Sequence, residues 1–260
     1  MRFSRRGVLP ALAGGLITSS ASAQPVSSAS PIALKLVVLD IGGTLIGDHG
    51  EVPDAMLGAF SRKGITVTPQ EFSGWRGASK RGMVKHFVEE RGPKDGRTAL
   101  EEAIYADFTI TVSKAYQNVQ PIPGAEKVLQ ELAAMKLLLA TTTGFDRPLT
   151  TQVLSHLGWQ HYFVASVTSD DVVDGRPAPY MLFRAMEAAH VNETAQVMAV
   201  GDTVLDLQAG NNGGMGAVVG VYSGAATESR LREEKSSAVL ASVAELPGLI
   251  RRGLPRPACR

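Results

Sequence analysis

The feature that most constrains the fold is the run LKLVVLDIGGTLI at residues 34–46. Five of the six residues from 34 to 39 are apolar, and a short apolar run that ends at a turn signal is typical of a buried parallel strand. Asp40 ends this run, and Gly42 and Gly43 force a tight turn after it. Open α/β sheets bind ligands at the carboxyl ends of their strands, so Asp40 is a candidate nucleophile or metal ligand. The alternative is a strand that merely ends in Asp before a glycine turn.

Strands and helices are predicted to alternate along the chain from residue 119 onward. This alternation favours right-handed βαβ units and a doubly wound parallel sheet of the α/β class. The expected strands cover residues 137–141, 162–167, 197–200, 217–222 and 239–240. The expected helices start at Gly124, cover residues 147–157 and 179–190, extend to Asn211 after the fourth strand, and cover residues 243–251.

Residues 51–118 have a different pattern, because apolar residues there recur mainly at helical spacing. Only the short stretch 65–67 resembles a strand. We therefore expect a helical cap domain at 51–118, inserted after the first strand of the sheet. The core domain is then formed by residues 33–50 and 119–252, and residues 253–260 form a tail.

The N-terminal sequence predicts a targeting signal rather than a folded element. Residues 1–23 combine a basic start, a moderately apolar middle and an Ala-Ser-Ala end, which is the pattern of a secretory signal peptide. Within it, residues 4–9 (SRRGVL) resemble a twin-arginine signal, with an ordinary Sec signal as the alternative. Residues 24–32 then form a linker. We expect a periplasmic or secreted protein.

Composition excludes several classes of protein. The formal net charge is +1, and no basic stripe with interleaved aromatic residues is present, so we expect no nucleic-acid partner. The signal region is too short and too rich in Gly and Ser for a membrane span, so we expect no stable membrane association. The single cysteine, Cys259, excludes an intrachain disulfide.

Polar side chains follow several of the predicted strands. In a parallel sheet these strand ends meet at one edge, where they form a single site. Carboxylate oxygens there suit Mg²⁺, which takes one or two protein carboxylates together with water and phosphate oxygens. Two of the acids would share a helix face if the helix after the fourth strand starts at once. The residues concerned are Asp40, Thr143, Gly144, Arg176 and the acidic pair Asp202 and Asp206.

The order of these residues resembles the haloacid dehalogenase superfamily of phosphotransferases and hydrolases, and within it the phosphonatase branch of phosphonoacetaldehyde hydrolase and its relatives. The likeness covers about residues 34–250, including the predicted cap. Four stretches carry it: Asp40-Ile41-Gly42-Gly43-Thr44, Gly77-Ala78-Ser79-Lys80, Thr142-Thr143-Gly144-Phe145-Asp146-Arg147 and Gly175-Arg176-Pro177-Ala178-Pro179.

The resemblance implies a HAD-like Rossmannoid core and a role for each site residue. It implies that Asp40 attacks phosphorus and becomes an aspartyl phosphate, and that Asp206 orients metal-bound water. It also implies one Mg²⁺ as cofactor. The implied metal ligands are Asp40, the backbone carbonyl of Gly42 and Asp202, and the implied phosphate-binding residues are Thr143, Gly144 and Arg176.

Gly42 is the informative departure from ordinary phosphatases of this superfamily. They carry a second Asp at that position as general acid and base, and such catalysis is worth about 10² to 10⁴-fold in rate. Phosphonatases also lack it, and a cap lysine forms a Schiff base with the substrate instead. Lys80 matches that lysine; the alternative is a solvated lysine that merely attracts anions. Three further positions depart from the phosphonoacetaldehyde enzymes: Arg76, Met83 and Phe145.

We therefore predict a Mg²⁺-dependent hydrolase that acts on a small phosphonate or phosphorylated substrate through an aspartyl phosphate, with Asp40 and Lys80 as catalytic residues. One alternative is a phosphate monoester phosphatase with a substituted proton-transfer group. Another is a catalytically weak protein of the same fold that binds phosphate ligands. A homodimer is possible.

The signal prediction has a direct test. A fusion of residues 1–30 to a folded reporter should reach the periplasm, because the twin-arginine route exports folded proteins. The double substitution Arg5→Lys with Arg6→Lys should stop this export, as measured by fractionation and immunoblotting. Continued export of the double variant would instead indicate a Sec signal.

Overall fold

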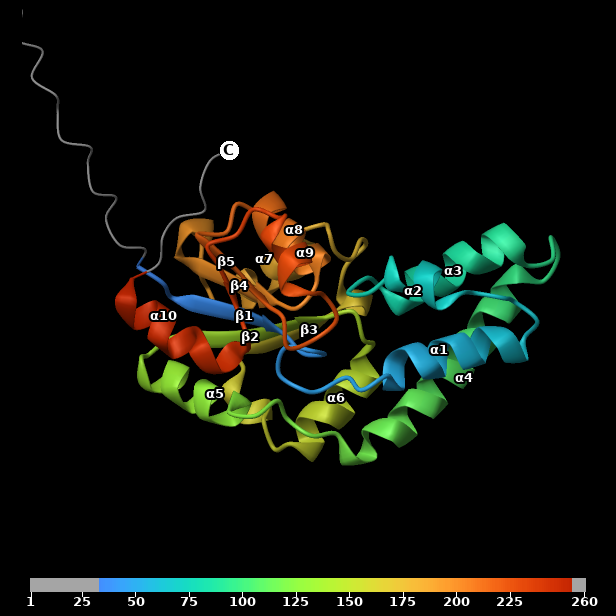
Figure 1. The fold of residues 1–260 in the computed structure, drawn as a ribbon, viewed down its shortest axis with the longest axis horizontal. Helices are drawn as coiled ribbons and strands as arrows, with labels where there is room; N and C mark the ends of the chain where they lie inside the picture. The colour runs from blue at the N-terminus through green and yellow to red at the C-terminus, as the bar shows by residue number, and fades with distance from the viewer. Residues whose placement is uncertain (1–32, 254–260) are drawn as a thin grey trace, which may run out of the picture. The chain divides into compact units, whose positions relative to one another are not determined.

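The structure, a computed structural model, describes residues 33–253 and is built on a six-stranded sheet in which every strand pair is parallel (Figure 1). The predicted signal peptide and linker, and residues 254–260 of the predicted tail, lie outside the described residues. The strand order is β3-β2-β1-β4-β5-β6, so the chain reverses direction across the sheet at β1. This order is that of doubly wound α/β folds and confirms the predicted class.

The strands agree with the predicted ones to within a few residues. Asp40 is the last residue of β1, and Thr143 is the last residue of β2, which extends two residues beyond its predicted end. The third strand starts three residues later than predicted, because residues 160–162 form a 3₁₀ turn. The strands are β1 Leu36–Asp40, β2 Leu138–Thr143, β3 Ala165–Thr168, β4 Val197–Gly201, β5 Ala217–Val221 and β6 Ala238–Leu240.

Strand β1 lies at the centre of the sheet and is buried on both faces. Val37 and Leu39 join the apolar cluster on one face, and Leu36 and Val38 join the cluster on the other. Fully burying such a side chain contributes about 1.5–3 kcal/mol. The strand therefore holds Asp40 at a fixed place at its carboxyl end.

The register brings the predicted site residues to one edge of the sheet. Asp40 is paired with Thr142 of β2, and Thr143 is paired with Thr168 of β3. On the other side of β1, Leu39 is paired with Val200 of β4, two residues before Asp202. The carboxyl ends of β1, β2 and β4 are therefore adjacent, as predicted.

Six α-helices of the core accompany the sheet, and five of them were expected. The unexpected one is α9, a single short turn of helix whose N-cap, Thr227, accepts a hydrogen bond from the Arg230 N–H at 3.3 Å. The core helices are α5 Ala125–Ala134, α6 Arg147–His156, α7 Tyr180–Ala188, α8 Val204–Asn212, α9 Glu228–Arg232 and α10 Leu246–Arg252. Short 3₁₀ segments at η1 Tyr116–Asn118, η2 Gln160–Tyr162, η3 Ser169–Asp171, η4 Thr194–Gln196 and η5 Val243–Glu245 join these elements.

Four helices between β1 and the first core helix form the region predicted as a cap (Figure 1). Phe60 and Phe87 pack edge to face inside it, with ring centres 5.5 Å apart. The strand-like stretch 65–67 is not a strand: Ile65 is buried and its N–H donates to the Phe60 carbonyl at the end of a helix. The cap helices are α1 Glu51–Arg62, α2 Pro69–Ser73, α3 Lys80–Arg91 and α4 Arg97–Ala115.

The loop between α2 and α3, residues 74–79, is seated directly against the core. Gly77 has a left-handed φ of +82°, and an added Cβ would overlap the Thr203 side chain. At Gly144, an added Cβ would lie 2.6 Å from the carbonyl oxygen of Ala78. Such close approaches to the backbone of residues 77 and 144 require glycine. The cap loop is therefore held within contact distance of the strand ends.

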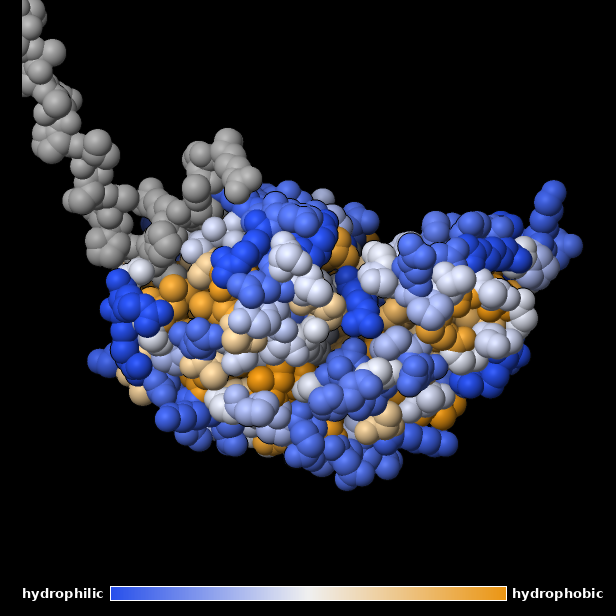
Figure 2. Space-filling view, in the orientation of Figure 1, coloured by the Kyte–Doolittle hydropathy of each residue, from blue (hydrophilic) through white to orange (hydrophobic). Residues whose placement is uncertain are grey.

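The surface is predominantly polar on the face shown in Figure 2, with apolar residues in small separate areas. Among the described residues, no helix is both long enough and apolar enough to span a membrane.

The seating of the cap loop predicts the effect of Gly77→Ala. The new Cβ meets both the left-handed φ, which costs about 1–2 kcal/mol, and the Thr203 side chain. Gly64→Ala is the matched control, because Gly64 has φ +75° but no atom within 4 Å of an added Cβ. We expect urea unfolding to show a larger loss of stability for Gly77→Ala than for Gly64→Ala. Equal losses would show that the loop is not tightly seated.

Candidate active site

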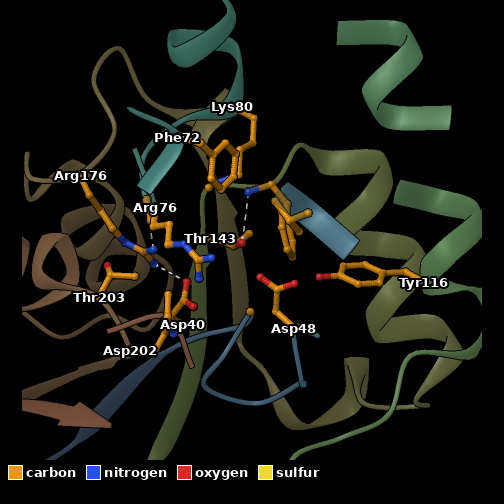
Figure 3. A pocket seen from close by; sticks show the side chains of 16 residues that line it. Asp40, Asp48, Phe72, Arg76, Lys80, Tyr116, Thr143, Arg176, Asp202 and Thr203 are labelled. Carbon is orange, nitrogen blue, oxygen red and sulfur yellow. Dashed lines mark hydrogen bonds and ion pairs between the residues drawn. The ribbon is translucent and has the colours of Figure 1, made fainter. Parts of the chain in front are cut away.

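A small cavity opens at the carboxyl edge of the sheet, between the strand ends and the cap loop (Figure 3). Its volume is about 50 Å³, so the cap leaves little free space above the strand ends. The core lines it with residues that include Asp40, Gly42, Thr143, Gly144, Arg176 and Asp202. The cap lines it with Phe72, Arg76, Gly77 and Lys80.

Asp40 projects into this cavity from the end of β1. Its side chain is buried, and its Oδ1 accepts a hydrogen bond from Arg176 Nη2 in an ion pair of 2.8 Å. Burial raises the pKa of Asp40 to about 7, although the neighbouring Arg176 acts in the opposite direction. A carboxylate held at a strand end and facing a cavity is placed to act as a nucleophile.

Arg176 connects two of the carboxylates and one strand end. Its Nη2 also donates to the backbone carbonyl and the hydroxyl of Thr142, each at 2.9 Å. Its Nε forms an ion pair with Asp206 Oδ1 at 3.0 Å. The Nε and Nη2 groups of this buried guanidinium therefore already face protein acceptors. Its positive charge offsets the negative charges of Asp40 and Asp206.

Asp202 and Asp206 come together with Asp40, but not on one helix face. Helix α8 begins at Val204, so Asp202 lies before the helix and the expectation of a shared face is wrong. Asp202 Oδ2 accepts the N–H of Ala225 at 2.6 Å. Burial, followed by the charge of Asp40, raises the pKa of Asp202 well above its usual range.

Asp206 is the third helical residue of α8 and closes a capping box. Its Oδ2 accepts hydrogen bonds from the N–H and the hydroxyl of Thr203, at 3.1 and 2.6 Å. Together with the bond from Arg176, these contacts engage both carboxylate oxygens. Asp206 therefore positions the side chains of Thr203 and Arg176.

The three acids fit a divalent metal ion. One carboxylate oxygen from each of Asp40, Asp202 and Asp206 lies within 4.8 Å of the others, and all three side chains are buried. Arg176 supplies a single positive charge against three carboxylates. Burial is the main cause of the raised pKa values of Asp40 and Asp202, and the charges of neighbouring carboxylates raise them further. Hard oxygen ligands of this kind suit Mg²⁺ or Ca²⁺. Asp202 and Asp40 are the better ligands, because both oxygens of Asp206 already have partners.

The Thr143–Gly144 turn and Gly42 lie on the opposite side of Asp40 from β4. The Thr143 hydroxyl accepts the N–H of Phe145 at 3.2 Å and lines the cavity. An added Cβ on Gly42 would lie 3.3 Å from the edge of the buried Phe145 ring. Phe145 therefore leaves little space for a side chain at position 42.

Lys80 enters the cavity from the first residue of α3. Its side chain is buried, and its Nζ donates to the carbonyl oxygen of Ala78 at 3.1 Å. Burial lowers the pKa of Lys80 to about 8, partly offset by the charge of Asp40. The alternative of a solvated lysine does not agree with this placement. A buried amine of lowered pKa suits covalent chemistry with a carbonyl.

The cavity residues that were not predicted as site residues include Asp48, Phe72, Arg76 and Tyr116. Burial raises the pKa of Asp48, and Figure 3 shows the Tyr116 hydroxyl directed toward it. That hydroxyl is buried and has no hydrogen-bond partner within residues 33–253. Asp48 lies eight residues after Asp40 in a polar turn, and nothing in its local sequence separates it from an ordinary turn residue.

Comparison with known proteins supports a hydrolase. The model of the haloacid dehalogenase-like hydrolase family matches residues 34–214. A phosphonoacetaldehyde hydrolase of Lysinibacillus sphaericus is 31% identical over 223 residues, which cover 80% of this chain and 81% of that protein. The phosphonoacetaldehyde hydrolase of Paraburkholderia phytofirmans is 27% identical over 207 residues, 74% of this chain and 76% of that protein.

Solved structures share the fold. A phosphonoacetaldehyde hydrolase-like protein from Oleispira antarctica superimposes with a TM-score of 0.74 at 22% identity, covering 86% of this chain and 96% of that one. A hydrolase from Pseudomonas syringae gives a TM-score of 0.74 at 20% identity, with 84% and 98% covered. At these identities the likeness establishes the arrangement of sheet and helices.

The carboxylate geometry predicts different outcomes for two conservative substitutions. Asp202→Asn should sharply weaken Mg²⁺ binding, because it removes a negative charge from a candidate ligand. Asp206→Asn should weaken it less, because both Asp206 oxygens are engaged by protein donors. Isothermal titration with Mg²⁺ measures both, with a thermal melt to verify folding. Unchanged Mg²⁺ binding by Asp202→Asn would show that the metal is held elsewhere.

Proposed function

Because the chain belongs to the haloacid dehalogenase-like hydrolase family, we propose that it is a Mg²⁺-dependent phosphonatase-like hydrolase with Asp40 as nucleophile. Its proposed substrate is a small phosphonate that carries an aldehyde or ketone beside the carbon–phosphorus bond. The observation that carries the proposal is Lys80, a buried amine that shares one cavity with Asp40. The names of the relatives point to the same substrate class.

Asp40 would attack phosphorus and form an aspartyl phosphate. Arg176 holds the carboxylate in place by the bond to Oδ1, which leaves Oδ2 as the attacking oxygen. The Thr143 hydroxyl and the turn at Gly144 line the cavity beside it and would hold the phosphoryl oxygens. Mg²⁺, held by Asp40, Asp202 and the carbonyl of Gly42, would offset the negative charge of the transferring group.

Gly42 and Phe145 together favour a phosphonate over a phosphate monoester. A monoester needs an acid that protonates the leaving oxygen, and such an acid is worth about 10² to 10⁴-fold. Glycine at position 42 cannot supply a proton. The Phe145 ring, 3.3 Å from where a Cβ would lie, also keeps a neighbouring carboxylate out of that space.

In a phosphonate the group that leaves phosphorus is a carbon fragment, and Lys80 would make this fragment a better leaving group. Its neutral amine adds to the substrate carbonyl, and loss of water gives an imine. When Asp40 takes the phosphoryl group, the electron pair of the broken carbon–phosphorus bond moves into the protonated imine, whose nitrogen keeps its proton, and a neutral enamine forms. Protonation of the enamine carbon and hydrolysis then release the carbonyl product and free Lys80, while water hydrolyses the aspartyl phosphate.

Asp48 supports a second candidate, a phosphate monoester phosphatase with a substituted proton-transfer group. Its carboxyl lines the same cavity, and burial raises its pKa, so that it holds a proton to a higher pH than an exposed carboxyl. In that case Asp48, rather than a residue at position 42, would protonate the leaving oxygen.

The proposal also includes the cellular setting and the partners expected from the sequence. We propose export to the periplasm or beyond, a small-molecule substrate as the principal partner, and no binding to nucleic acid or stable association with membranes.

Lys80→Arg decides between the two candidates, because arginine keeps the charge but forms no imine. With a keto- or aldehyde-phosphonate, the wild type should be inactivated by borohydride with a mass adduct on Lys80, and Lys80→Arg should show neither adduct nor turnover. The pKa of about 8 predicts that trapping speeds up as pH rises through 8, since only the neutral amine reacts. Phosphate release is measured in parallel.

Asp40→Asn is the control for this experiment, because it should abolish phosphate release while leaving the lysine free to form the adduct. Efficient hydrolysis of a simple phosphate monoester by Lys80→Arg would contradict the phosphonatase proposal and support the phosphatase.

A further inference from the structure

Arg76 lies in the loop between α2 and α3 and lines the cavity from the side of the cap. Figure 3 shows its guanidinium directed from this loop toward Asp40. The Arg76 N–H donates to the carbonyl of Ser73 at 3.3 Å, and its guanidinium carbon lies 6.0 Å from the centre of the buried Phe72 ring. The next residue, Gly77, is the one seated against Thr203. Arg76 is therefore held in place from both sides.

The Arg76 guanidinium differs from the other arginines of the cap. Within residues 33–253 it forms no ion pair, and no group accepts a hydrogen bond from its side chain. A half-buried cation that faces a cavity without an acceptor has its donors available for a ligand. Each other cap arginine has an acceptor: Arg62 bonds Asp107, Arg81 bonds Glu102, Arg91 bonds Glu71 and Arg97 bonds the carbonyl of Pro93.

The remaining cavity cations are committed to other contacts. Arg176 Nη2 contacts Asp40 and Thr142, and its Nε contacts Asp206. Its Nη1 lies 3.5 Å from the carbonyl oxygen of Gly77. Lys80 donates to Ala78, and an amine that forms an imine must be uncharged. A phosphoryl group beside Asp40 brings two negative charges. Among the described residues, Arg76 is then the cavity cation whose side-chain donors are all free.

We propose that Arg76 is a phosphoryl-binding residue, supplied by the cap, whose guanidinium donates to the oxygens of the group transferred to Asp40. A planar guanidinium pairs two donors with phosphoryl oxygens and stays charged at every working pH. The phosphoryl group then lies between Asp40 of the core and Arg76 of the cap. This inference goes beyond the proposed function and rests on it only in requiring that a phosphoryl group binds beside Asp40.

Inorganic phosphate is the probe, because its binding depends neither on a carbon–phosphorus bond nor on an imine. Isothermal titration of the full chain with phosphate in the presence of Mg²⁺ compares the wild type with Arg76→Met and Arg76→Lys. Loss of charge-assisted hydrogen bonds should weaken phosphate binding by about 10- to 100-fold in Arg76→Met. Arg76→Lys should recover part of this loss. Thermal melts verify that each variant folds.

Arg62→Met is the matched control, because Arg62 is also a cap arginine but lies exposed on the surface in a pair with Asp107. It removes the same charge without touching the cavity and should change phosphate affinity by no more than about twofold, as exposed pairs contribute little. Equal small effects of Arg62→Met and Arg76→Met would overturn the proposal and show that Arg76 acts only by general attraction.

The remaining outcomes separate this proposal from the phosphonatase assignment. Unchanged phosphate binding by Arg76→Met, with phosphonate turnover by the wild type, overturns the role of Arg76 alone. Weakened binding by Arg76→Met, without phosphonate turnover by the wild type, supports Arg76 and contradicts the phosphonatase assignment. Absence of phosphate binding by the wild type overturns both.

Discussion

The site depends on one buried guanidinium. Arg176 contacts Asp40, Asp206 and the end of β2, so it ties the carboxyl ends of β1 and β2 to the first turn of α8. Removing one partner from a buried ion pair costs about 3–5 kcal/mol, because the remaining charge stays buried. Arg176 supplies one positive charge for three acids, however, and burial, together with neighbouring carboxylate charge, raises the pKa values of Asp40 and Asp202. A divalent cation at these oxygens would offset the remaining negative charge.

The second constraint is the close contact between the cap loop and the core. Gly77 against Thr203, and Gly144 against Ala78, leave no room for side chains at either glycine. This contact places Lys80 and Arg76 in the cavity whose floor is Asp40. In the proposed mechanism the core supplies the nucleophile and the metal ligands, and the cap supplies the amine and a free cation. The hydroxyl of Tyr105 reinforces the arrangement by donating to Asp146 at 2.8 Å.

Much of the fold and of the candidate site was predictable because it follows from local patterns. Apolar runs that end in polar residues identify β1, β2 and β4, and parallel strands necessarily bring Asp40, Thr143 and Asp202 to one edge. The start of α8 was not predictable to the residue, because Thr203 serves as its N-cap and leaves Asp202 outside the helix. Arg76, Asp48 and Tyr116 join the cavity through tertiary contacts alone. The packing of Phe145 against Gly42 explains why a residue without a side chain suits position 42, which the sequence alone does not explain.

The central claim is that Asp40 carries the phosphoryl group during turnover. The most direct measurement is a rapid acid quench of a single turnover, followed by borohydride reduction and peptide mass spectrometry. Reduction of an acyl phosphate converts the aspartate to homoserine. The account predicts this conversion at Asp40 and at no other carboxylate, with its amount rising and falling as phosphate appears. Full phosphate release without conversion at Asp40, or conversion at Asp48 or Asp202, would contradict it.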